Sequence, residues 1–106
     1  MSDNSADTPS VDKPLFPLGQ VVATVGALMA LEAAGEAPHV FLLRHATGDW
    51  GDLVEEDRQA NARALGEAGN SGERILSAYT LANGTRLWVI TEWDRSVTTL
   101  LLPTDY

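Results

Sequence analysis

Residues 74–102, RILSAYTLANGTRLWVITEWDRSVTTLLL, decide the fold class of this chain. Branched and aromatic residues dominate three short runs in this stretch, which predicts strands over 74–81, 86–92 and 97–102. Asn83-Gly84 separates the first two runs and is a strong hairpin signal. Asp94-Arg95 is expected to form the second turn. The stretch therefore predicts a three-stranded antiparallel meander.

A two-residue turn at Asn83-Gly84 would also fix which strand residues face each other. The expected cross-strand pairs are Tyr79–Trp88, Ser77–Ile90, Trp88–Leu101 and Ile90–Thr99. By alternation, one face is apolar and should form the core: Leu76, Ala78, Thr80, Leu87, Val89, Leu100 and Leu102. The other face is mixed: Ser77, Tyr79, Arg86, Trp88, Ile90, Glu92, Thr99 and Leu101.

The mixed face allows two interpretations. Aromatic side chains with Arg86 nearby can stack on bases or contact a protein partner. Alternatively, the N-terminal segment, Phe16 and Trp50 cover this face and make a second small core. If it is uncovered, we expect a binding surface, because monomers rarely expose that much contiguous apolar area.

A strand and a helix are expected at the start of the ordered chain. Residues 20–24 predict a short strand, and Thr24 can cap a helix over 25–34 that ends at Gly35. This helix is apolar on nearly every side, so we expect it to be buried.

Two more helices are expected before the meander. Pro38 suits the first position of a helix that ends near Ala46. Asp52 is expected to cap a third helix over 53–68, because Glu55 follows at the spacing of a capping box. The acidic run 55–57 either stabilises the start of this helix or mimics phosphates toward a basic groove.

Together these patterns predict one α+β domain over residues 15–106. It contains a short N-terminal strand that we expect to join the sheet, three helices packed on one sheet face, and the meander. Residues 1–14 are polar and acidic and are expected to form a disordered tail.

Composition limits the functions that are open to this chain. The net charge is -8, from 15 acidic and 7 basic residues, which disfavours general nucleic-acid binding. The absence of cysteine excludes disulfides and thiolate metal sites. No leading signal segment and no membrane-spanning run is visible, so we expect a cytoplasmic protein without membrane association. No cofactor motif is present, and we expect no cofactor.

The corner 44–53 concentrates polar and aromatic side chains between two expected helices. His45 could act as a general base oriented by Asp49 or Asp52. The alternative is a stiff corner in which the carboxylates cap helices and Trp50 packs on the core. His39 and His45 are six residues apart, on different sides of a helix, so we expect no metal site.

The hairpin tip 92–96 presents a tryptophan beside an arginine, the composition of a binding hot spot. An ordinary charged tip that discourages edge pairing is the alternative. Across the corner, the mixed face and the tip, the candidate binding residues are Asp49, Trp50, Tyr79, Trp88, Trp93 and Arg95.

Three stretches together resemble a known family: 16–24 (FPLGQVVAT), 48–53 (GDWGDL) and 90–103 (ITEWDRSVTTLLLP). The chain is similar, over nearly all of 16–106, to short bacterial proteins that plasmids, integrative elements and prophages carry. The resemblance implies a mobile genetic element and no particular activity. Val25 stands where these proteins have a proline, a departure that leaves the Thr24 cap intact.

A weaker resemblance concerns the fold alone. Helices followed by an antiparallel meander resemble barnase-like and colicin-like ribonuclease toxins. That analogy implies a catalytic set of His45, Arg86, Thr91, Arg95 and Thr98.

Our leading hypothesis is a non-enzymatic interaction protein of a mobile element. It would bind a protein partner as an acidic inhibitor of a host nucleic-acid-binding defence complex of the restriction or CRISPR type. The alternative is a ribonuclease toxin. The sequence leaves homo-oligomerisation open.

Overall fold

The computed structural model describes residues 13–66 and 72–106 and confirms the α+β class. The elements in chain order are β1 (Gln20–Ala23), α1 (Val25–Ala34), α2 (Pro38–Ala46), α3 (Glu55–Leu65), β2 (Ile75–Thr80), β3 (Arg86–Thr91), β4 (Val97–Leu101) and the short 3₁₀ turn η3 (Pro103–Asp105). The expected tail and the end of the expected third helix fall on 1–12 and 67–71, outside the described residues.

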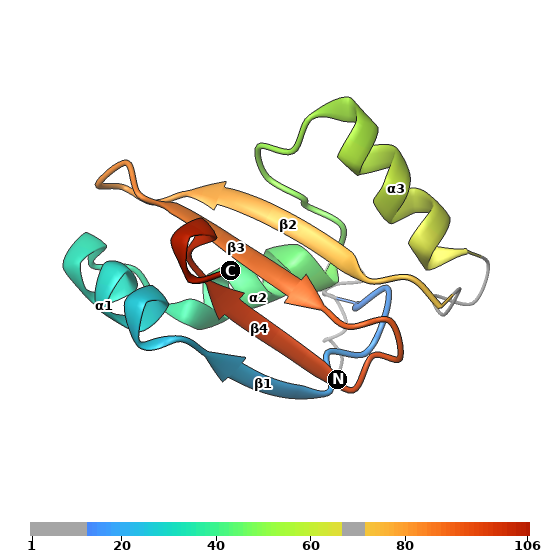
Figure 1. Ribbon diagram of the computed structural model, residues 1–106, viewed down its shortest axis with the longest axis horizontal. Helices are drawn as coiled ribbons and strands as arrows, with labels where there is room; N and C mark the ends of the chain where they lie inside the picture. The colour runs from blue at the N-terminus through green and yellow to red at the C-terminus, as the bar shows by residue number, and fades with distance from the viewer. Residues whose placement is uncertain (1–12, 67–71) are drawn as a thin grey trace, which may run out of the picture.

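The sheet is four-stranded and mixed, in the order β1-β4-β3-β2. The three C-terminal strands pair antiparallel as expected, and β1 adds a parallel strand beside β4. Figure 1 shows α2 behind the sheet and α3 beyond the β2 edge. The sheet is therefore larger than the three-stranded meander alone, because the N-terminal strand joins it, as expected, and does so parallel to β4.

The pairing of β2 with β3 differs by one residue from the expected register. Leu81 N–H donates to the Thr85 carbonyl at 2.8 Å, so the turn is a three-residue loop that contains Gly84 at φ 87°. Tyr79 therefore lies opposite Leu87 and joins the core, whereas Ala78 lies opposite Trp88. The expected β3–β4 register is confirmed, with Trp88 opposite Leu101 and Ile90 opposite Thr99.

This shift reverses the two faces of β2. The buried cluster on the helix side of the sheet comprises Ala27, Leu31, Phe41, Tyr79, Leu81, Leu87, Val89 and Leu100. Leu76, Ala78 and Thr80, which the sequence placed in the core face, share the opposite face with Trp88 and Ile90. On that face Trp88 contacts the ring of Tyr106, with centroids 5.9 Å apart.

The bounds of α1 are those expected from its caps. Thr24 Oγ1 accepts from the Ala27 N–H at 3.1 Å, and Gly35 ends the helix at φ 71°. The expectation of burial on all sides is wrong, because Val25, Leu28 and Met29 are exposed.

The start of α3 also differs from the expectation. The helix begins at Glu55 with Val54 as its cap residue, and Asp52 caps nothing. Instead, the Asp52 carboxylate accepts from Thr80 Oγ1 at 2.7 Å. Its backbone N–H donates to the Ala78 carbonyl at 2.7 Å, which holds the chain extended along the edge of β2.

In the part of the chain that the structure describes, no helix is long and apolar enough to cross a membrane.

Candidate functional site

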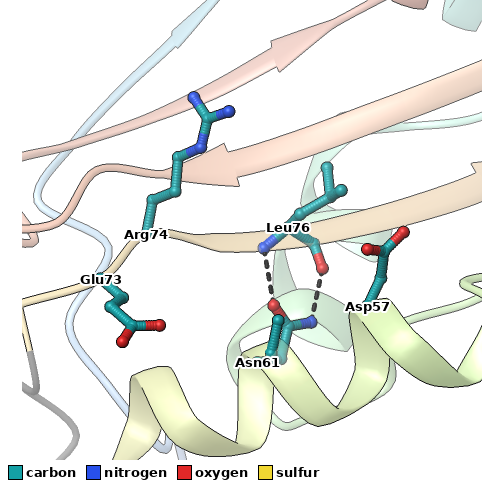
Figure 2. Close-up of a pocket in the computed structure, with 6 residues that line it drawn as sticks. Asp57, Asn61, Glu73, Arg74 and Leu76 are labelled. Carbon is teal, nitrogen blue, oxygen red and sulfur yellow. Dashed lines mark hydrogen bonds between the residues drawn. The ribbon is translucent and has the colours of Figure 1, made fainter.

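A shallow cleft of about 300 Å³ lies between α3 and the start of β2 (Figure 2). Its polar centre is Asn61, whose side-chain amide donates to the Leu76 carbonyl and accepts from the Leu76 N–H at 2.6 and 3.1 Å. The amide thus pairs with β2 as a neighbouring strand would. Asn61 was not singled out from the sequence, although its spacing of three and four residues from Ala64 and Leu65 on the thin apolar stripe is a usable signal.

The remaining polar groups of the cleft do not converge. The Arg74 and Glu73 side chains extend in opposite directions in Figure 2, and the Arg74 guanidinium lies 5.4 Å from the Tyr106 ring centre. Asp57 is exposed on the first turn of α3. The cleft is therefore a seam between helix and sheet.

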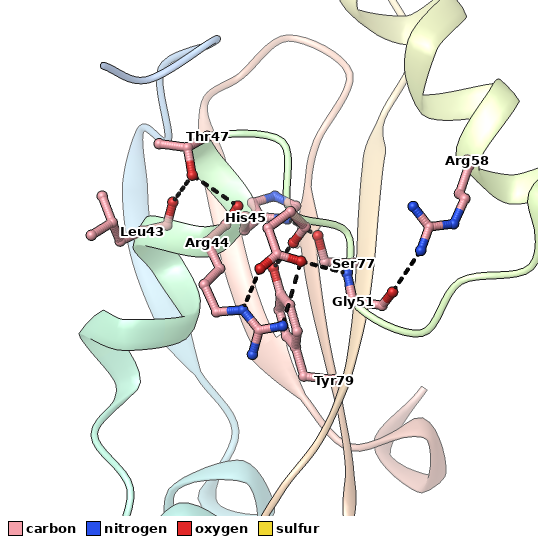
Figure 3. A network of polar contacts seen from close by, with 9 residues as sticks. Leu43, Arg44, His45, Thr47, Gly51, Arg58, Ser77 and Tyr79 are labelled. Atoms are coloured by element: carbon pink, nitrogen blue, oxygen red, sulfur yellow. Dashed lines mark hydrogen bonds and ion pairs between the residues drawn. The ribbon is translucent and has the colours of Figure 1, made fainter. Parts of the chain in front are cut away.

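The corner 44–53 is held by an ion pair and an aromatic ring (Figure 3). Arg44 Nε donates to Asp49 Oδ2 at 2.7 Å, and the guanidinium carbon lies 4.5 Å from the Tyr79 ring centre. The Tyr79 hydroxyl donates to the Asp49 carbonyl at 2.7 Å. The bond from Arg44 lowers the pKa of Asp49, and burial raises the pKa of Tyr79 to about 12, so both groups keep these roles at neutral pH.

Gly51 lets this corner lie against β2. Its φ is 74°, and a Cβ there would overlap the Ala78 carbonyl and press on the Tyr79 ring. Trp50 and Asp52 on either side exchange backbone hydrogen bonds with Ala78. The glycine is therefore required by both the backbone angle and the close approach.

Gly51→Ala is expected to lower the free energy of unfolding by about 2–3 kcal/mol, from left-handed backbone strain and steric overlap. Urea unfolding measures this loss. Gly35→Ala is the matched control, since Gly35 has φ 71° and no atom within 4 Å of its added Cβ. Equal losses in the two variants would show that the close approach contributes nothing.

His45 lies at the bottom of the corner and is completely buried. Its Nδ1 is 2.6 Å from Ser77 Oγ, and its Nε2 is 2.9 Å from Thr91 Oγ1. The rings of Phe16 and Trp50 lie against it with centroids 5.3 and 6.1 Å away. Burial lowers the pKa of His45 to about 3, so the imidazole is neutral.

The hydroxyl groups around His45 form a chain with one direction. Thr98 Oγ1 donates to the Leu18 carbonyl at 2.7 Å, so the bond of 2.6 Å between Thr91 and Thr98 must use the Thr91 proton. Thr91 then accepts from His45 Nε2–H, and Nδ1 accepts from Ser77. This chain of hydrogen bonds fixes one tautomer of His45 and links α2, three strands and the N-terminal segment.

This arrangement does not form the catalytic set that the ribonuclease analogy implied. His45, Thr91 and Thr98 do come together, but all three are fully buried and bonded to one another. Arg86 lies apart from them on the exposed start of β3. A general base needs to reach the substrate proton, and buried His45 has no such access here.

Arg95, the fifth member of that set, is also buried, with an exposed fraction of 5%. Its guanidinium donates to four backbone carbonyls: Ala64, Glu73, Glu92 and Trp93. Its carbon lies 5.8 Å from the Phe16 ring centre. Burial lowers the pKa of Arg95 from its ordinary value. Arg95 therefore joins the hairpin tip to α3 and to Glu73, two residues before β2.

The candidate binding residues divide by exposure. Asp49 and Trp93 are exposed, and Trp93 at 60% stands free at the hairpin tip. Trp88 is half-buried beneath Tyr106. The other candidates are buried and are therefore not surface hot spots: Trp50, Tyr79 and Arg95.

A second surface was missed from the sequence. Exposed apolar side chains line β1 and the start of α1: Val21, Val22, Val25, Leu28 and Met29. Their pattern predicted a short strand followed by a buried helix, and only the packing shows that the described residues leave one side uncovered.

Among the described residues no three histidine, aspartate or glutamate side chains come together to hold a metal ion. Comparisons with protein-family models, curated proteins and solved structures found no match for this chain.

Proposed function

We propose that the chain is a non-enzymatic interaction protein of a mobile genetic element. The observation that carries this proposal is how the side chains are used. His45, Thr91 and Arg95 are engaged inside the fold, whereas large apolar side chains on β1 and α1 face solvent. Apolar surface of that kind is typical of proteins that bind other proteins.

We further propose that the partner is a host defence complex that binds nucleic acid, of the restriction or CRISPR type. The supporting feature is the acidic corner, which we define as Asp49, Asp52, Glu55, Glu56 and Asp57. All five are exposed, on the loop before α3 and on its first turn. With a net charge of -8, these carboxylates complement the basic groove that such a complex uses for phosphates.

The proposal predicts that the protein protects incoming DNA. In strains with an active restriction or CRISPR system, its expression should raise the transformation efficiency of a targeted plasmid. Glu55→Gln with Glu56→Gln should reduce this protection about tenfold, the factor that follows from 1.4 kcal/mol of lost binding. No protection in any strain would refute the proposed partner.

A charge-matched control separates local charge from net charge. Glu32→Gln with Glu73→Gln removes the same charge from exposed positions outside the acidic corner. This control should keep full protection. Thermal unfolding of both double variants accounts for the fraction of a kcal/mol that each carboxylate in the first turn of a helix contributes to stability.

A further inference from the structure

The two edges of the sheet are unlike. Along β2, backbone groups at Trp50 and Asp52 bond to Ala78, and the Asn61 amide takes both the N–H and the carbonyl of Leu76. The β2 edge is thus covered over its middle. Sheet edges that stay open are templates for pairing with another chain.

The β1 edge has no such cover within the described residues. Gln20 N–H and Thr24 N–H donate to carbonyls of Ser96 and Leu100, on the β4 side. Backbone groups alternate along a strand, so those of Val21 and Ala23 point away from the sheet. Figure 1 shows β1 as the outermost strand, opposite β2.

Apart from its length of only four residues, this edge also lacks the usual protections against pairing. Natural edges use charged side chains, prolines or bulges. The strand Gln20–Ala23 has none of these, and Val21 and Val22 are 43% and 39% exposed. Directly after it, α1 exposes Val25, Leu28 and Met29, at helical spacing on one side.

The distribution of charged residues indicates what covers the exposed border that β1 and the first turns of α1 form. No charged residue occurs in the 18 positions from Pro14 to Leu31, in a chain of net charge -8. Two copies of an acidic protein repel each other wherever carboxylates meet, and this border lets them meet without that repulsion. A basic partner would find no complementary charge here and would favour the acidic corner instead.

We propose that β1 pairs antiparallel with β1 of a second copy of this chain, forming a two-fold dimer with one continuous sheet. The outward groups set the register: Val21 lies opposite Ala23 of the second copy, and Val22 lies opposite Val22 at the two-fold axis. Each Val21–Ala23 pair exchanges two backbone hydrogen bonds, which gives four in all. The first turn of α1, with Val25, then runs alongside Pro17–Gly19 of the second copy.

The dimer covers the apolar side chains of β1 and α1, which support protein interaction in general, and it leaves the acidic corner free for the proposed defence partner. Light scattering of the purified full-length chain should give twice the monomer mass of 11.4 kDa. A mass that stays at 11.4 kDa up to high micromolar concentration would overturn the dimer without bearing on protection of DNA.

Val22→Cys tests the register directly. The chain has no cysteine, so the variant carries a single thiol. Facing residues of a non-hydrogen-bonded antiparallel pair have Cα atoms about 4.5 Å apart, within disulfide range. Mild oxidation should link Val22→Cys copies about a hundredfold faster than Val54→Cys copies, whose thiols meet only by collision. Val54 is 63% exposed and lies outside β1 and α1. Equal rates would overturn the register.

Val21→Pro separates dimerisation from folding. Its lost N–H points outward, so the bonds of β1 to β4 remain, and proline is tolerated on an edge strand. We expect a folded monomer with an unchanged circular dichroism spectrum. A Val21→Pro protein that keeps the double mass would refute pairing through β1.

Discussion

Arg95→Met is expected to lower the free energy of unfolding by about 3–4 kcal/mol and Tm by about 15 °C. The substitution keeps much of the side-chain volume but removes every donor. Four backbone carbonyls from three parts of the chain then lose the hydrogen bonds that the guanidinium donates. Buried polar groups without partners are among the most destabilising features in a protein.

Two control variants separate the stability that the guanidinium contributes from the effect of the backbone angle at position 95. Arg95 has φ 60°, a conformation that glycine adopts without strain. Arg95→Gly should still unfold far below the wild type, because relief of strain does not replace the lost donors. Arg95→Lys should recover only part of the loss, since one ammonium cannot bridge carbonyls on opposite sides of a planar fork.

The same variants decide between two roles for Arg95. As a hot spot on the hairpin tip, it would affect partner binding and leave stability unchanged. Trp93→Ala is the comparison, since Trp93 is 60% exposed at the same tip and should change Tm little. Thermal unfolding of Arg95→Met at wild-type Tm would contradict the structural role.

The structure agrees best with the sequence where one local signal determines the conformation. Thr24 and Gly35 bound α1 because a cap hydroxyl and a left-handed residue act within a few positions of themselves. The β3–β4 register was also correct, because a two-residue turn at 94–95 and the observed loop at 93–96 give the same pairing.

The structure departs from the expectation where one extra loop residue exchanges the two faces of β2. Asn83-Gly84 fits either a two-residue turn or a three-residue loop with glycine at positive φ. The chain uses the second, so Ser77 and Tyr79 point toward the helices. Because side chains alternate with a period of two, that single step moved Ser77 and Tyr79 from the supposed binding face into the core.

The role of His45 could not be found from its neighbours in sequence. Its two hydrogen-bond partners, Ser77 and Thr91, lie 32 and 46 residues away and become partners only through the β2 register. The sequence suggested Asp49 or Asp52 instead, but those carboxylates bond to Arg44 and Thr80. The corner is therefore a structural joint, as in the interpretation of a stiff corner, except that its carboxylates bond to Arg44 and Thr80 instead of capping helices.

That joint makes the fold sensitive to acid. The pKa of His45 is about 3 in the folded chain, against an ordinary value of 6.5, because burial and the positive charge of Arg95 disfavour the imidazolium. Below pH 6.5 the unfolded chain binds a proton that the folded chain excludes, so folding loses free energy as pH falls. The contribution of His45 is complete above pH 6.5 and decreases down to about pH 3.

Between pH 6.5 and 4.5, the free energy of unfolding is expected to fall by up to about 1.4 kcal/mol per pH unit. This window lies above 3.8, the ordinary value for Asp49, Asp94 and Asp105, whose pKa values are lowered further in the fold. Urea unfolding at several pH values measures the slope. His45→Gln keeps a donor and an acceptor but cannot titrate, so its stability should be lower at pH 7 and nearly flat across the window. His39→Gln, on the exposed side of the same helix, should keep the full slope. A slope that survives in His45→Gln would assign the acid sensitivity to another group and would mean that the imidazole is protonated as readily in the fold as in water.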